Sequence, residues 1–397
     1  MEYNSNVVIG VCGGIAAYKA LDVISALRKR NINVDVIMTK HATEFVTPLT
    51  FQSISYNKVV VDMFEEPKYW EIQHISLAKK ADLFVVLPAT ANIIGKVANG
   101  IADDMLSTTI MATKAPVLFC PAMNTGMYEN IIVQENIKKL RAYGYEFMEP
   151  DTGMLACGDT GKGKLPKPEI ITEAILSRLY KKNDLSGKRV LVTAGPTLVN
   201  IDPVRYITNR STGKMGYAIA EEARDRGAEV LLITGPTDIK IPYGVNSINV
   251  KTNSEMLKAV MDNFNDKDII IKSAAVADYK PRNYSESKIK KVNEILELEL
   301  IQDVDILKEL GKIKKSNQVL VGFAAESNDL IENAKRKLES KNLDFIVAND
   351  IKSADTGFAS DYNRVTIIDR DGNAAHLDKM SKRQVACEIF NKILKGR

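Results

Sequence analysis

The feature that most constrains the fold is a pattern that occurs twice: a short apolar run, a glycine-containing turn, and a segment with helical spacing of its apolar residues. The first copy begins at Val7 to Val11 and continues through Gly13-Gly14. The second begins at Arg189 to Thr193 and continues through Gly195. Short apolar runs that alternate with helical segments are typical of parallel sheets buried on both faces. The pattern therefore predicts two doubly wound, Rossmann-like α/β domains.

Further apolar runs follow each copy, as expected for the remaining strands of such sheets. They cover residues 34–38, 83–87 and 117–120 in the first half, and 229–233, 269–271, 319–323 and 345–347 in the second. The polar stretch KKNDLSGK starts at Lys181 and predicts a boundary between domains 1–180 and 181–397. Near the C-terminus, alternating residues around Asp371-Gly372 predict a β-hairpin at the sheet edge.

Length and composition exclude several classes of protein. A chain of 397 residues exceeds what one core usually serves, and no apolar segment is long enough to span a bilayer. The N-terminus lacks a basic stretch followed by an apolar run, so the cytoplasm is the expected location. The 54 basic and 50 acidic residues are scattered, so nucleic acid is not expected as a partner. The cysteines Cys12, Cys120, Cys157 and Cys387 form no C-x-x-C pair, which argues against structural zinc.

The loop after the first apolar run is the first candidate ligand site, because open parallel sheets bind ligands beyond the carboxyl ends of their strands. Gly13 and Gly14, with Ile15 after them, would let the backbone approach a phosphate at a helix N-terminus. The loop lacks both the G-x-G-x-x-G pattern and an acidic ribose partner at the usual distance. Taken alone, it fits a plain strand-to-helix turn better than a dinucleotide site.

Several short motifs change that interpretation. They are GVCGGIAAYK from Gly10, QHISL from Gln73, LPATANIIGKVAN from Leu87, PAMN from Pro121, and GMLACG continuing to GKGKL from Gly153. In this order they resemble the phosphopantothenoylcysteine decarboxylase family of flavoproteins, over residues 5 to 175. The resemblance implies that His74, Asn124 and Cys157 are catalytic. It also implies FMN as the cofactor, bound by Gly13, Gly14, Ile15 and Ser107.

The chemistry explains why such residues are needed. Direct loss of carbon dioxide from an N-acylcysteine would leave a carbanion without an electron sink, whereas oxidation of the thiol-bearing carbon gives a thioaldehyde that can accept the electrons. Cys157 is then the expected proton donor to the enethiol, His74 a general acid or base, and Asn124 the amide that holds the substrate carboxylate. The glycine-rich segment from Gly153 to Lys164 predicts a lid. A lone His or Cys is more often structural, and core packing is expected for the other three cysteines.

The second half carries a denser set of motifs. They are DLSGKRVLVTAGPT, DPVRYITNRSTGKMG, SAAVADY, KIKK, VGFAAES and NLDFIVAND, between residues 184 and 350. These resemble the phosphopantothenate–cysteine ligase family, and the order of the two halves resembles the bacterial fusion of both families. The resemblance implies a bifunctional enzyme of coenzyme A biosynthesis that takes 4′-phosphopantothenate, L-cysteine and CTP. The ligase would make the compound that the decarboxylase consumes.

The resemblance also implies roles for individual residues of the second half. Lys288 in KIKK would bind the triphosphate, and Asn209 would handle the acyl-nucleotide intermediate. Mg²⁺ is expected to bridge the phosphates. The expected nucleotide-binding residues are Ala274, Ala275, Asp278, Phe323, Lys337 and Lys341. A solvated basic face for KIKK and a packed strand end for SAAVADY are the simpler alternatives.

Two departures from the ligase pattern affect the expected contacts. Leu198-Val199 replaces a polar or acidic pair, and Gln302-Asp303-Val304-Asp305 replaces Asn-Pro-Asp. Three rival functions are a non-enzymatic flavin-binding regulatory subunit, a flavin prenyltransferase and a nicotinamide dehydrogenase. The joint presence of His74, Asn124 and Cys157 argues against the first, and none of the three needs a second nucleotide domain with KIKK. A visible spectrum separates a flavoprotein from the dehydrogenase. The family resemblance further implies decarboxylase trimers and ligase dimers, while selectivity for CTP over ATP stays open.

Overall fold

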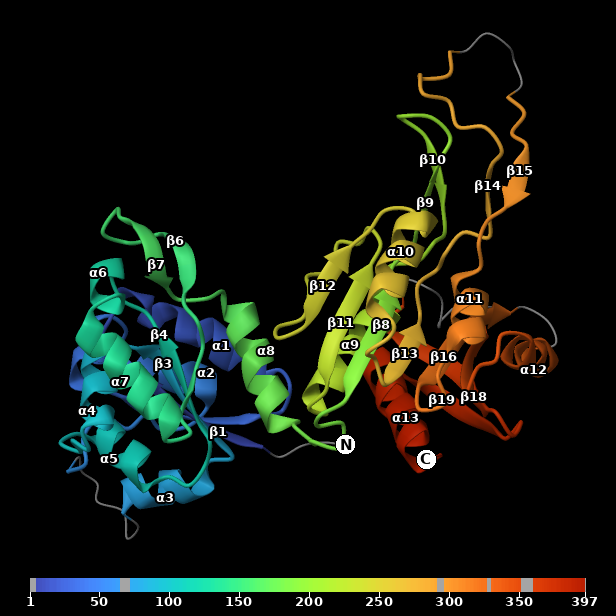
Figure 1. Cartoon of the computed structure of the whole chain (residues 1–397). Coiled ribbons are helices and arrows are strands. Elements are labelled where there is room, and N and C mark those ends of the chain that lie inside the picture. The colour runs from blue at the N-terminus through green and yellow to red at the C-terminus, as the bar shows by residue number, and fades with distance from the viewer. Residues whose placement is uncertain (1–4, 65–71, 291–295, 327–329, 351–359, 397) are drawn as a thin grey trace. The chain divides into compact units, whose positions relative to one another are not determined.

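A computed structural model describes residues 5–64, 72–290, 296–326, 330–350 and 360–396. The chain divides into two compact units, Met1–Leu179 and Tyr180–Arg397 (Figure 1). Within the described ranges, no helix is both long enough and apolar enough to cross a membrane.

The first unit is built on a parallel sheet of five strands in the order β2-β1-β3-β4-β5. Its strands are β1 (Asn6–Val11), β2 (Asn33–Met38), β3 (Leu83–Ala89), β4 (Val117–Pro121) and β5 (Glu146–Phe147), and a separate hairpin is formed by β6 (Asp151–Met154) and β7 (Thr160–Lys164). Its helices are η1 (Ile15–Tyr18), α1 (Lys19–Arg28), η2 (Lys40–Glu44), α2 (Pro48–Ser55), α3 (Gln73–Lys80), α4 (Ala91–Ala98), α5 (Met105–Ala112), α6 (Thr125–Tyr128), α7 (Ile131–Ala142) and α8 (Pro168–Leu179).

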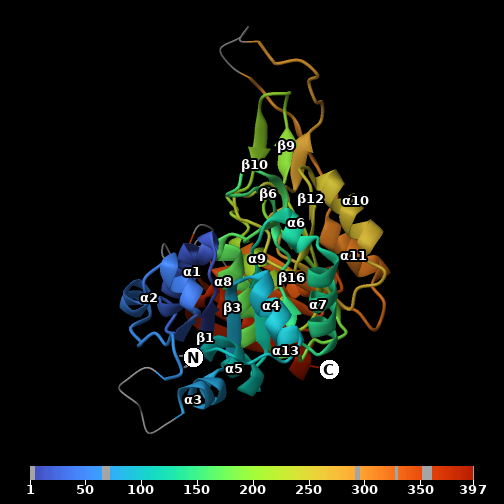
Figure 2. The same ribbon diagram turned by 90° about the vertical axis from the view of Figure 1, so that its left-hand side faces the viewer.

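Helices cover both faces of this sheet, as Figure 2 shows from the side. One face carries Val8, Phe84 and Phe119, which pack in one apolar cluster with residues of α4, α5 and α7. β3 and β4 are buried along their whole length, and β1 along all but its first residue, which explains why these strands appear in the sequence as continuous apolar runs rather than alternating ones. The loops that carry the sequence motifs follow directly after the carboxyl ends of β1, β3 and β4.

The second unit contains a sheet of eight strands in the order β12-β11-β8-β13-β16-β17-β18-β19. Its strands are β8 (Arg189–Ala194), β11 (Glu229–Thr234), β12 (Asn246–Asn249), β13 (Ile269–Lys272), β16 (Val319–Glu326), β17 (Phe345–Asp350), β18 (Tyr362–Asp369) and β19 (Ala374–Ser381). Its helices are α9 (Lys214–Asp225), α10 (Asn253–Asn263), α11 (Ile306–Ile313), α12 (Leu330–Ser340) and α13 (Lys382–Lys395).

Side-chain alternation along the strands assigns each helix to one face of this sheet. Val190 and Val192 of β8 join a cluster with α9 and α13, whereas Leu191 joins the opposite cluster with α10, α11 and α12. The outer strands β17, β18 and β19 pair antiparallel, and the remaining pairs are parallel. The predicted doubly wound fold and the hairpin around Asp371-Gly372 are confirmed.

Two features were not predicted from the sequence. One is the β6–β7 hairpin of the first unit. The other is an arm made of two short ladders, β9 (Leu198–Asn200) with β10 (Tyr206–Thr208) and β14 (Tyr279–Pro281) with β15 (Leu300–Gln302). Figure 1 shows both ladders extending from the body of the second unit. Strands of three residues are too short to produce a recognisable alternation, so the apolar pattern could not reveal them.

Candidate active sites

Asn124 and Cys157 lie together in the first unit. Asn124 precedes α6, and its Oδ1 accepts a hydrogen bond from the backbone N–H of Gly126 at 2.8 Å. This bond directs Nδ2 toward the β6–β7 turn, where it lies 3.3 Å from Cys157 Sγ and donates to Asp159 Oδ2 at 2.9 Å. The Cys157 thiol in turn donates to the same carboxylate oxygen at 3.4 Å. An amide, a thiol and a carboxylate thus meet at one exposed point.

The β6–β7 hairpin is held against this point by glycines. The backbone N–H of Met123 donates to the carbonyl of Gly163 at 3.0 Å. Gly163 has a φ of +146°, and a Cβ added there would collide with the carbonyl oxygen of Met123. A Cβ at Gly161 would likewise collide with Thr125. The glycines of the expected lid therefore allow two backbones to approach closely, besides permitting unusual dihedral angles.

His74 is not brought to this cluster within one chain. It is the second residue of α3, and it is half-buried. Figures 1 and 2 both show α3 at one end of the first unit and α6, β6 and β7 at the other. The three residues that the sequence grouped as catalytic are thus divided between two ends of the same unit.

The residues expected at FMN lie around the carboxyl end of β1. Gly13 packs against His41, whose Cβ would lie 2.6 Å from an added Cβ. Gly14 faces open space, since an added Cβ would meet only Thr90 Cγ2 at 4.0 Å, and the Ile15 side chain is exposed. Ser107 is fully buried and belongs to the capping box of α5, where its hydroxyl donates to Asp104 Oδ1 at 2.8 Å.

The other cysteines differ in their surroundings. Cys12 and Cys120 are buried, and desolvation raises the pKa of each thiol to about 12. Both therefore pack as small apolar side chains, as expected from the sequence. Cys387 is half-buried instead, and its sulfur accepts a hydrogen bond from Arg226 Nη2 at 3.2 Å. That contact with a buried guanidinium could not be expected from an apolar run.

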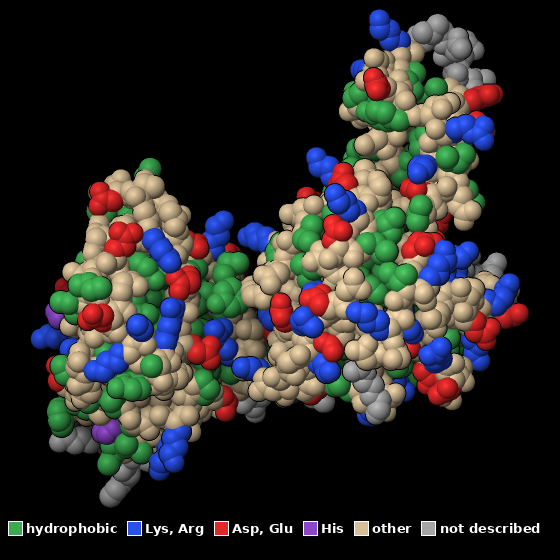
Figure 3. Space-filling view, viewed as in Figure 1, with side chains coloured by type: hydrophobic (Ala, Val, Ile, Leu, Met, Phe, Trp, Pro, Cys, Tyr) green, Lys and Arg blue, Asp and Glu red, His purple; other side chains and the backbone are tan. Residues whose placement is uncertain are grey.

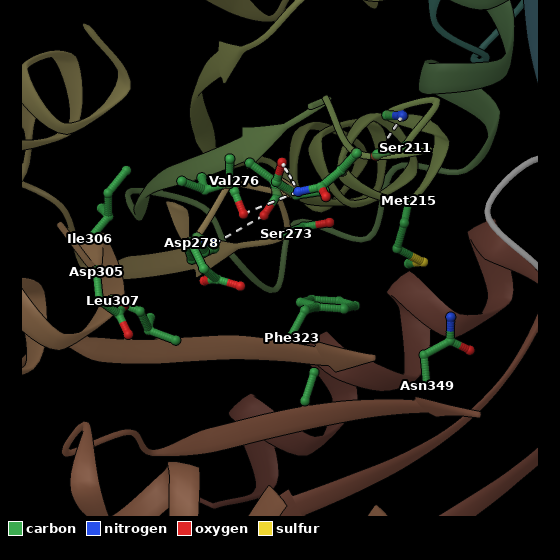
Figure 4. A pocket seen from close by; sticks show the side chains of 18 of the residues that line it. Ser211, Met215, Ser273, Val276, Asp278, Asp305, Ile306, Leu307, Phe323 and Asn349 are labelled. Carbon is green, nitrogen blue, oxygen red and sulfur yellow. Dashed lines mark hydrogen bonds between the residues drawn. The ribbon is translucent and has the colours of Figure 1, made fainter. Parts of the chain in front are cut away.

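The second unit contains a cavity of about 520 Å³ at the carboxyl ends of its parallel strands. All the nucleotide-binding residues expected from the sequence, other than Lys288, contribute to its lining, and so does Asn209. Figure 4 shows the side chains of Asp278 and Phe323 directed into the cavity, with Asp305 on one side and Met215 and Asn349 on the other. The N-terminal turn of α9 also lines it, and a helix N-terminus favours anions.

Asn209 is fixed by the loop that follows β13. Its Nδ2 donates to the carbonyl oxygens of Ala275 at 3.0 Å and Val276 at 3.1 Å. The same loop is tied to the turn after β8, because Ala275 N–H donates to Gly195 O at 2.9 Å and Ala277 N–H donates to Thr197 Oγ1 at 3.1 Å. The GPT motif, which is distant in sequence, therefore supports the SAAVADY loop from behind, and residues 273–278 of that loop line the cavity.

Lys288 lies outside the lining of this cavity. It is exposed in the arm, beyond β14, and the next residue is anchored to the segment between β9 and β10. Ile289 N–H donates to Asp202 Oδ2 at 3.2 Å, and Arg205 Nη2 donates to Ile289 O at 2.7 Å. Lys290 is described and exposed, whereas Lys291 of the KIKK motif lies outside the described residues.

The two segments that depart from the ligase pattern lie in different places, one in the arm and the other at the cavity. Leu198 and Val199 begin the arm in β9, where Val199 is buried. The segment 302–305 lines the cavity. Asp305 caps the N-terminus of α11 and forms an ion pair with Lys341 at 2.6 Å. Burial alone would raise the pKa of Asp305, but the hydrogen bond from Lys341 and the nearby charges lower it overall.

Two polar residues of these sites were not identified from the sequence. Asp159 lies against Asn124 and Cys157. It belongs to the ACGD segment of the glycine-rich motif, but the sequence analysis gave it no role. Lys272 lines the cavity of the second unit, and desolvation lowers the pKa of its ammonium to about 8. The available signal was the lysine that ends the otherwise apolar run IIIK of β13, since a lysine is seldom buried without a polar partner.

Acidic and histidine side chains do not form a metal centre in the described part of the chain. No group of three or more His, Cys, Asp or Glu residues there is arranged to hold a metal ion.

Comparisons with known proteins agree with this architecture. Residues 1–180 match the flavoprotein family model, and residues 185–396 match the model of the DNA/pantothenate metabolism flavoprotein C-terminal domain. The coenzyme A biosynthesis bifunctional protein CoaBC of Bacillus subtilis (strain 168) is 50% identical over 99% of this chain and 97% of its own length. The protein of the same name from Borreliella burgdorferi is 47% identical over 98% of this chain and 99% of its own length.

One solved structure is also similar over part of the chain. The crystal structure of the C-terminal domain of a CoaBC protein is 45% identical, covers 54% of this chain and 97% of that chain, and has a TM-score of 0.47. The identities over nearly full length settle the relationship. The chain belongs to the CoaBC family of bifunctional coenzyme A biosynthesis enzymes, with a flavoprotein decarboxylase domain followed by a ligase domain.

Proposed function

We propose that residues 1–180 form an FMN-dependent phosphopantothenoylcysteine decarboxylase and residues 181–397 form a CTP-dependent phosphopantothenate–cysteine ligase. The observation that carries the proposal is that chemically required groups converge in each unit. In the first unit Asn124 Nδ2 lies 3.3 Å from Cys157 Sγ. In the second, Asn209 lines the same cavity as the other expected nucleotide residues except Lys288.

In the decarboxylase, the Asn124 amide holds the substrate carboxylate and Cys157 returns a proton. The bond from Gly126 N–H to Asn124 Oδ1 leaves the Nδ2 donors directed toward the hairpin. A neutral amide suits this role because it holds the carboxylate without a full positive charge that would oppose the loss of neutral carbon dioxide, whose bonding electrons pass to the thioaldehyde. The Cys157 S–H is held close to the same amide, where it can protonate the enethiolate that remains.

The residues at the end of β1 fit FMN. A Cβ added at Gly14 would meet only Thr90 Cγ2, at 4.0 Å, and Gly14 follows a buried strand of a parallel sheet, where phosphates bind. When bound there, FMN supplies the reversible oxidation of the thiol-bearing carbon. Gly13, Gly14 and Ile15 would hold it. Ser107 would stabilise the start of α5 behind that loop, since its hydroxyl is already used by Asp104.

His74 would meet Asn124 and Cys157 of a neighbouring copy. The opposite placement of α3 and the β6–β7 hairpin within one unit supports an assembly in which each site takes His74 from one chain and the hairpin from the next (Figures 1 and 2). Cyclic assemblies place two different surface patches in contact in this way. A trimer of decarboxylase units is the form that the sequence resemblance implies.

In the ligase, the cavity binds CTP and the acyl-cytidylate. Lys337 and Lys341 supply positive charge near the N-terminus of α11, and Phe323 and Asp278 face the space between (Figure 4). Asn209 projects into this cavity while its own amide is held by Ala275 and Val276 carbonyls. These two bonds use both Nδ2 hydrogens and fix the orientation of the amide at the cavity wall. Mg²⁺, when bound together with the nucleotide, would neutralise part of the negative charge of its phosphates.

Lys288 would act in a paired ligase unit. It is carried on the arm, whose exposed apolar side chains are those expected at a contact between copies. They include Val204, Tyr206, Ile207, Tyr279, Tyr284, Leu296, Leu298 and Leu300. Figure 3 shows hydrophobic side chains along the visible face of the arm. Dimerisation through the arm would bring Lys288 of one copy toward the cavity of the other.

One incubation tests both halves of the proposal. The protein is mixed with 4′-phosphopantothenate, L-cysteine, CTP and magnesium, and the products are measured by mass spectrometry. Formation of 4′-phosphopantetheine with release of pyrophosphate is the expected result. Parallel incubation with ATP measures nucleotide selectivity. Accumulation of neither phosphopantothenoylcysteine nor phosphopantetheine with any nucleotide would refute the assignment, whereas phosphopantothenoylcysteine alone would support only the ligase. A cytoplasmic location and the lack of a nucleic-acid partner stay predictions.

A further inference from the structure

Lys272 points into the nucleotide cavity from the centre of the large sheet. It is the last residue of β13, between the parallel strands β8 and β16. Ile270, two residues earlier, packs on the face covered by α10, α11 and α12, whereas Ile269 and Ile271 pack on the other face. Because side chains two positions apart share a face, Lys272 is directed toward α11 and α12. It lines the cavity there.

The Lys272 ammonium has no carboxylate partner of its own. Its Nζ donates a hydrogen bond to the carbonyl of Ala274 at 3.0 Å, and among the described residues it forms no ion pair. Asp305 is the neighbouring carboxylate that acts on it most strongly, but that group already pairs with Lys341 at 2.6 Å. Lys272 is half-buried at the cavity wall, and a cation that is partly removed from water is costly unless an opposite charge reaches it. An anion that enters the cavity would supply that charge.

The protonation of Lys272 is sensitive to its surroundings. Burial lowers the pKa of its ammonium to about 8. Among the charged groups around it, Asp305 and Asp278 oppose this shift, whereas Lys341 and Lys337 add to it. With such a pKa, about half of the Lys272 side chains are neutral at pH 8 in the free protein. Nearby phosphate oxygens would favour the charged form.

We propose that Lys272 binds the polyphosphate of the nucleotide and takes up a proton when the nucleotide binds. The inference rests on the proposed CTP site. It adds Lys272 to the residues that bind the nucleotide, and it adds the uptake of one proton to the binding reaction. The negative phosphates stabilise the ammonium, so the bound state holds Lys272 protonated over a wider pH range than the free state. Above pH 8 the free protein must first gain that proton, so nucleotide affinity falls as the pH rises.

Calorimetric titration of the full chain with CTP and magnesium tests the proposal at pH 7.5 and pH 9, in pairs of buffers with different ionisation enthalpies. We expect the dissociation constant to rise about eightfold between these pH values. Proton uptake should rise from about a quarter of a proton per CTP to about nine tenths. These pH values avoid the titration of the terminal phosphate, which is already ionised there.

Two variants separate the contribution of the Lys272 charge from that of the rest of the site. Lys272→Met keeps the length of the side chain without its charge, so it should bind CTP more weakly at pH 7.5 and show neither the pH dependence nor the proton uptake. Lys272→Arg stays charged at pH 9, so it should keep its affinity with a nearly flat pH dependence. Thermal melting of each variant without ligand verifies that it is folded.

The outcomes distinguish this inference from the function on which it rests. Wild-type binding with no proton uptake, or an unchanged pH dependence in Lys272→Met, would overturn the role of Lys272 and leave the CTP site intact. Failure of the wild-type protein to bind CTP at either pH would instead overturn the proposed nucleotide site. Loss of pH dependence in both variants, with binding by the wild type, supports the proposal.

Discussion

Asn124 Nδ2 lies 3.3 Å from Cys157 Sγ, although 33 positions separate the two residues in the chain. The contact exists because two backbone elements meet without intervening side chains: the turn before α6 and the glycine-rich strand β7. It places a hydrogen-bond donor for a carboxylate beside a proton donor, which is the combination that a decarboxylase of this type requires.

Cys157→Ser should keep FMN and ligase activity but fail to complete the decarboxylase cycle, because a hydroxyl is a far weaker proton donor than a thiol. Carbon dioxide should still be released, with an oxidised product trapped or set free and with the flavin left reduced. Mass spectrometry of the products and the visible spectrum measure both. A wild-type yield of phosphopantetheine would sink the assignment of Cys157.

Gly163→Ala should detach the hairpin, because Gly163 has a φ of +146° and an added Cβ would collide with the Met123 carbonyl. We expect decarboxylase turnover to fall about tenfold or more while ligase turnover is unchanged. Gly153→Ala is the matched control on β6, because its added Cβ would meet Lys164 Cδ only at an ordinary 3.6 Å. Equal losses in both variants would show that docking of the hairpin is not the cause.

His74→Asn and Cys157→Ser should complement each other when they are coexpressed. If each site takes His74 from one copy and Cys157 from the next, random mixing restores about a quarter of the wild-type sites. Each variant alone should be inactive in phosphopantetheine formation, with His74→Asn blocked before carbon dioxide release. Coexpression of His74→Asn with the double variant is the control and should restore nothing. Absence of complementation in verified mixed oligomers would mean that each site is built by one chain.

Lys288→Gln and Asn209→Asp should impair different steps of the ligase. Loss of the Lys288 ammonium leaves the developing phosphate charge less compensated, so formation of the acyl-cytidylate should fall about a hundredfold. Asn209→Asp keeps the size of the side chain but places a carboxylate beside a phosphate, so the cytidylate should form and be consumed poorly.

Quenched reactions without and with cysteine measure these two steps, with pyrophosphate and the cytidylate quantified by mass spectrometry. Normal cytidylate levels in the Lys288 variant would contradict its role in the first step. Conversion of the cytidylate at the wild-type rate by the Asn209 variant would contradict the second.

Thiol reactivity should follow burial. The pKa of Cys12 and of Cys120 is raised to about 12, so each thiol stays neutral until the pH approaches that value. At pH 8 only about one in ten thousand of these thiols is the reactive thiolate. Iodoacetamide at pH 8 should therefore label exposed Cys157 first, as read by peptide mass spectrometry, and all four cysteines after denaturation in urea. Equally fast labelling of Cys12 or Cys120 in the folded protein would show that the site is open.

The sequence by itself determined where the buried strands of the two sheets lie and what chemistry the motifs can perform. Buried strands such as β1 and β13 are apolar along their length because both faces are covered, so their positions follow from local composition. The resemblance of the motifs to the ligase family predicted that residues such as Asn209 and Phe323 act at one site, and both line the same cavity.

Only the tertiary structure decided which of these residues meet. The contact of Asn124 with Asp159, the separation of His74 from Cys157, and the position of Lys288 on an arm all depend on pairings between distant segments. The ladders of the arm and of the hairpin are three to five residues long, and the hairpin also needs glycines such as Gly163 where its backbone approaches Met123. The burial that lowers the pKa of Lys272 is likewise created by the surrounding helices and not by its neighbours in sequence.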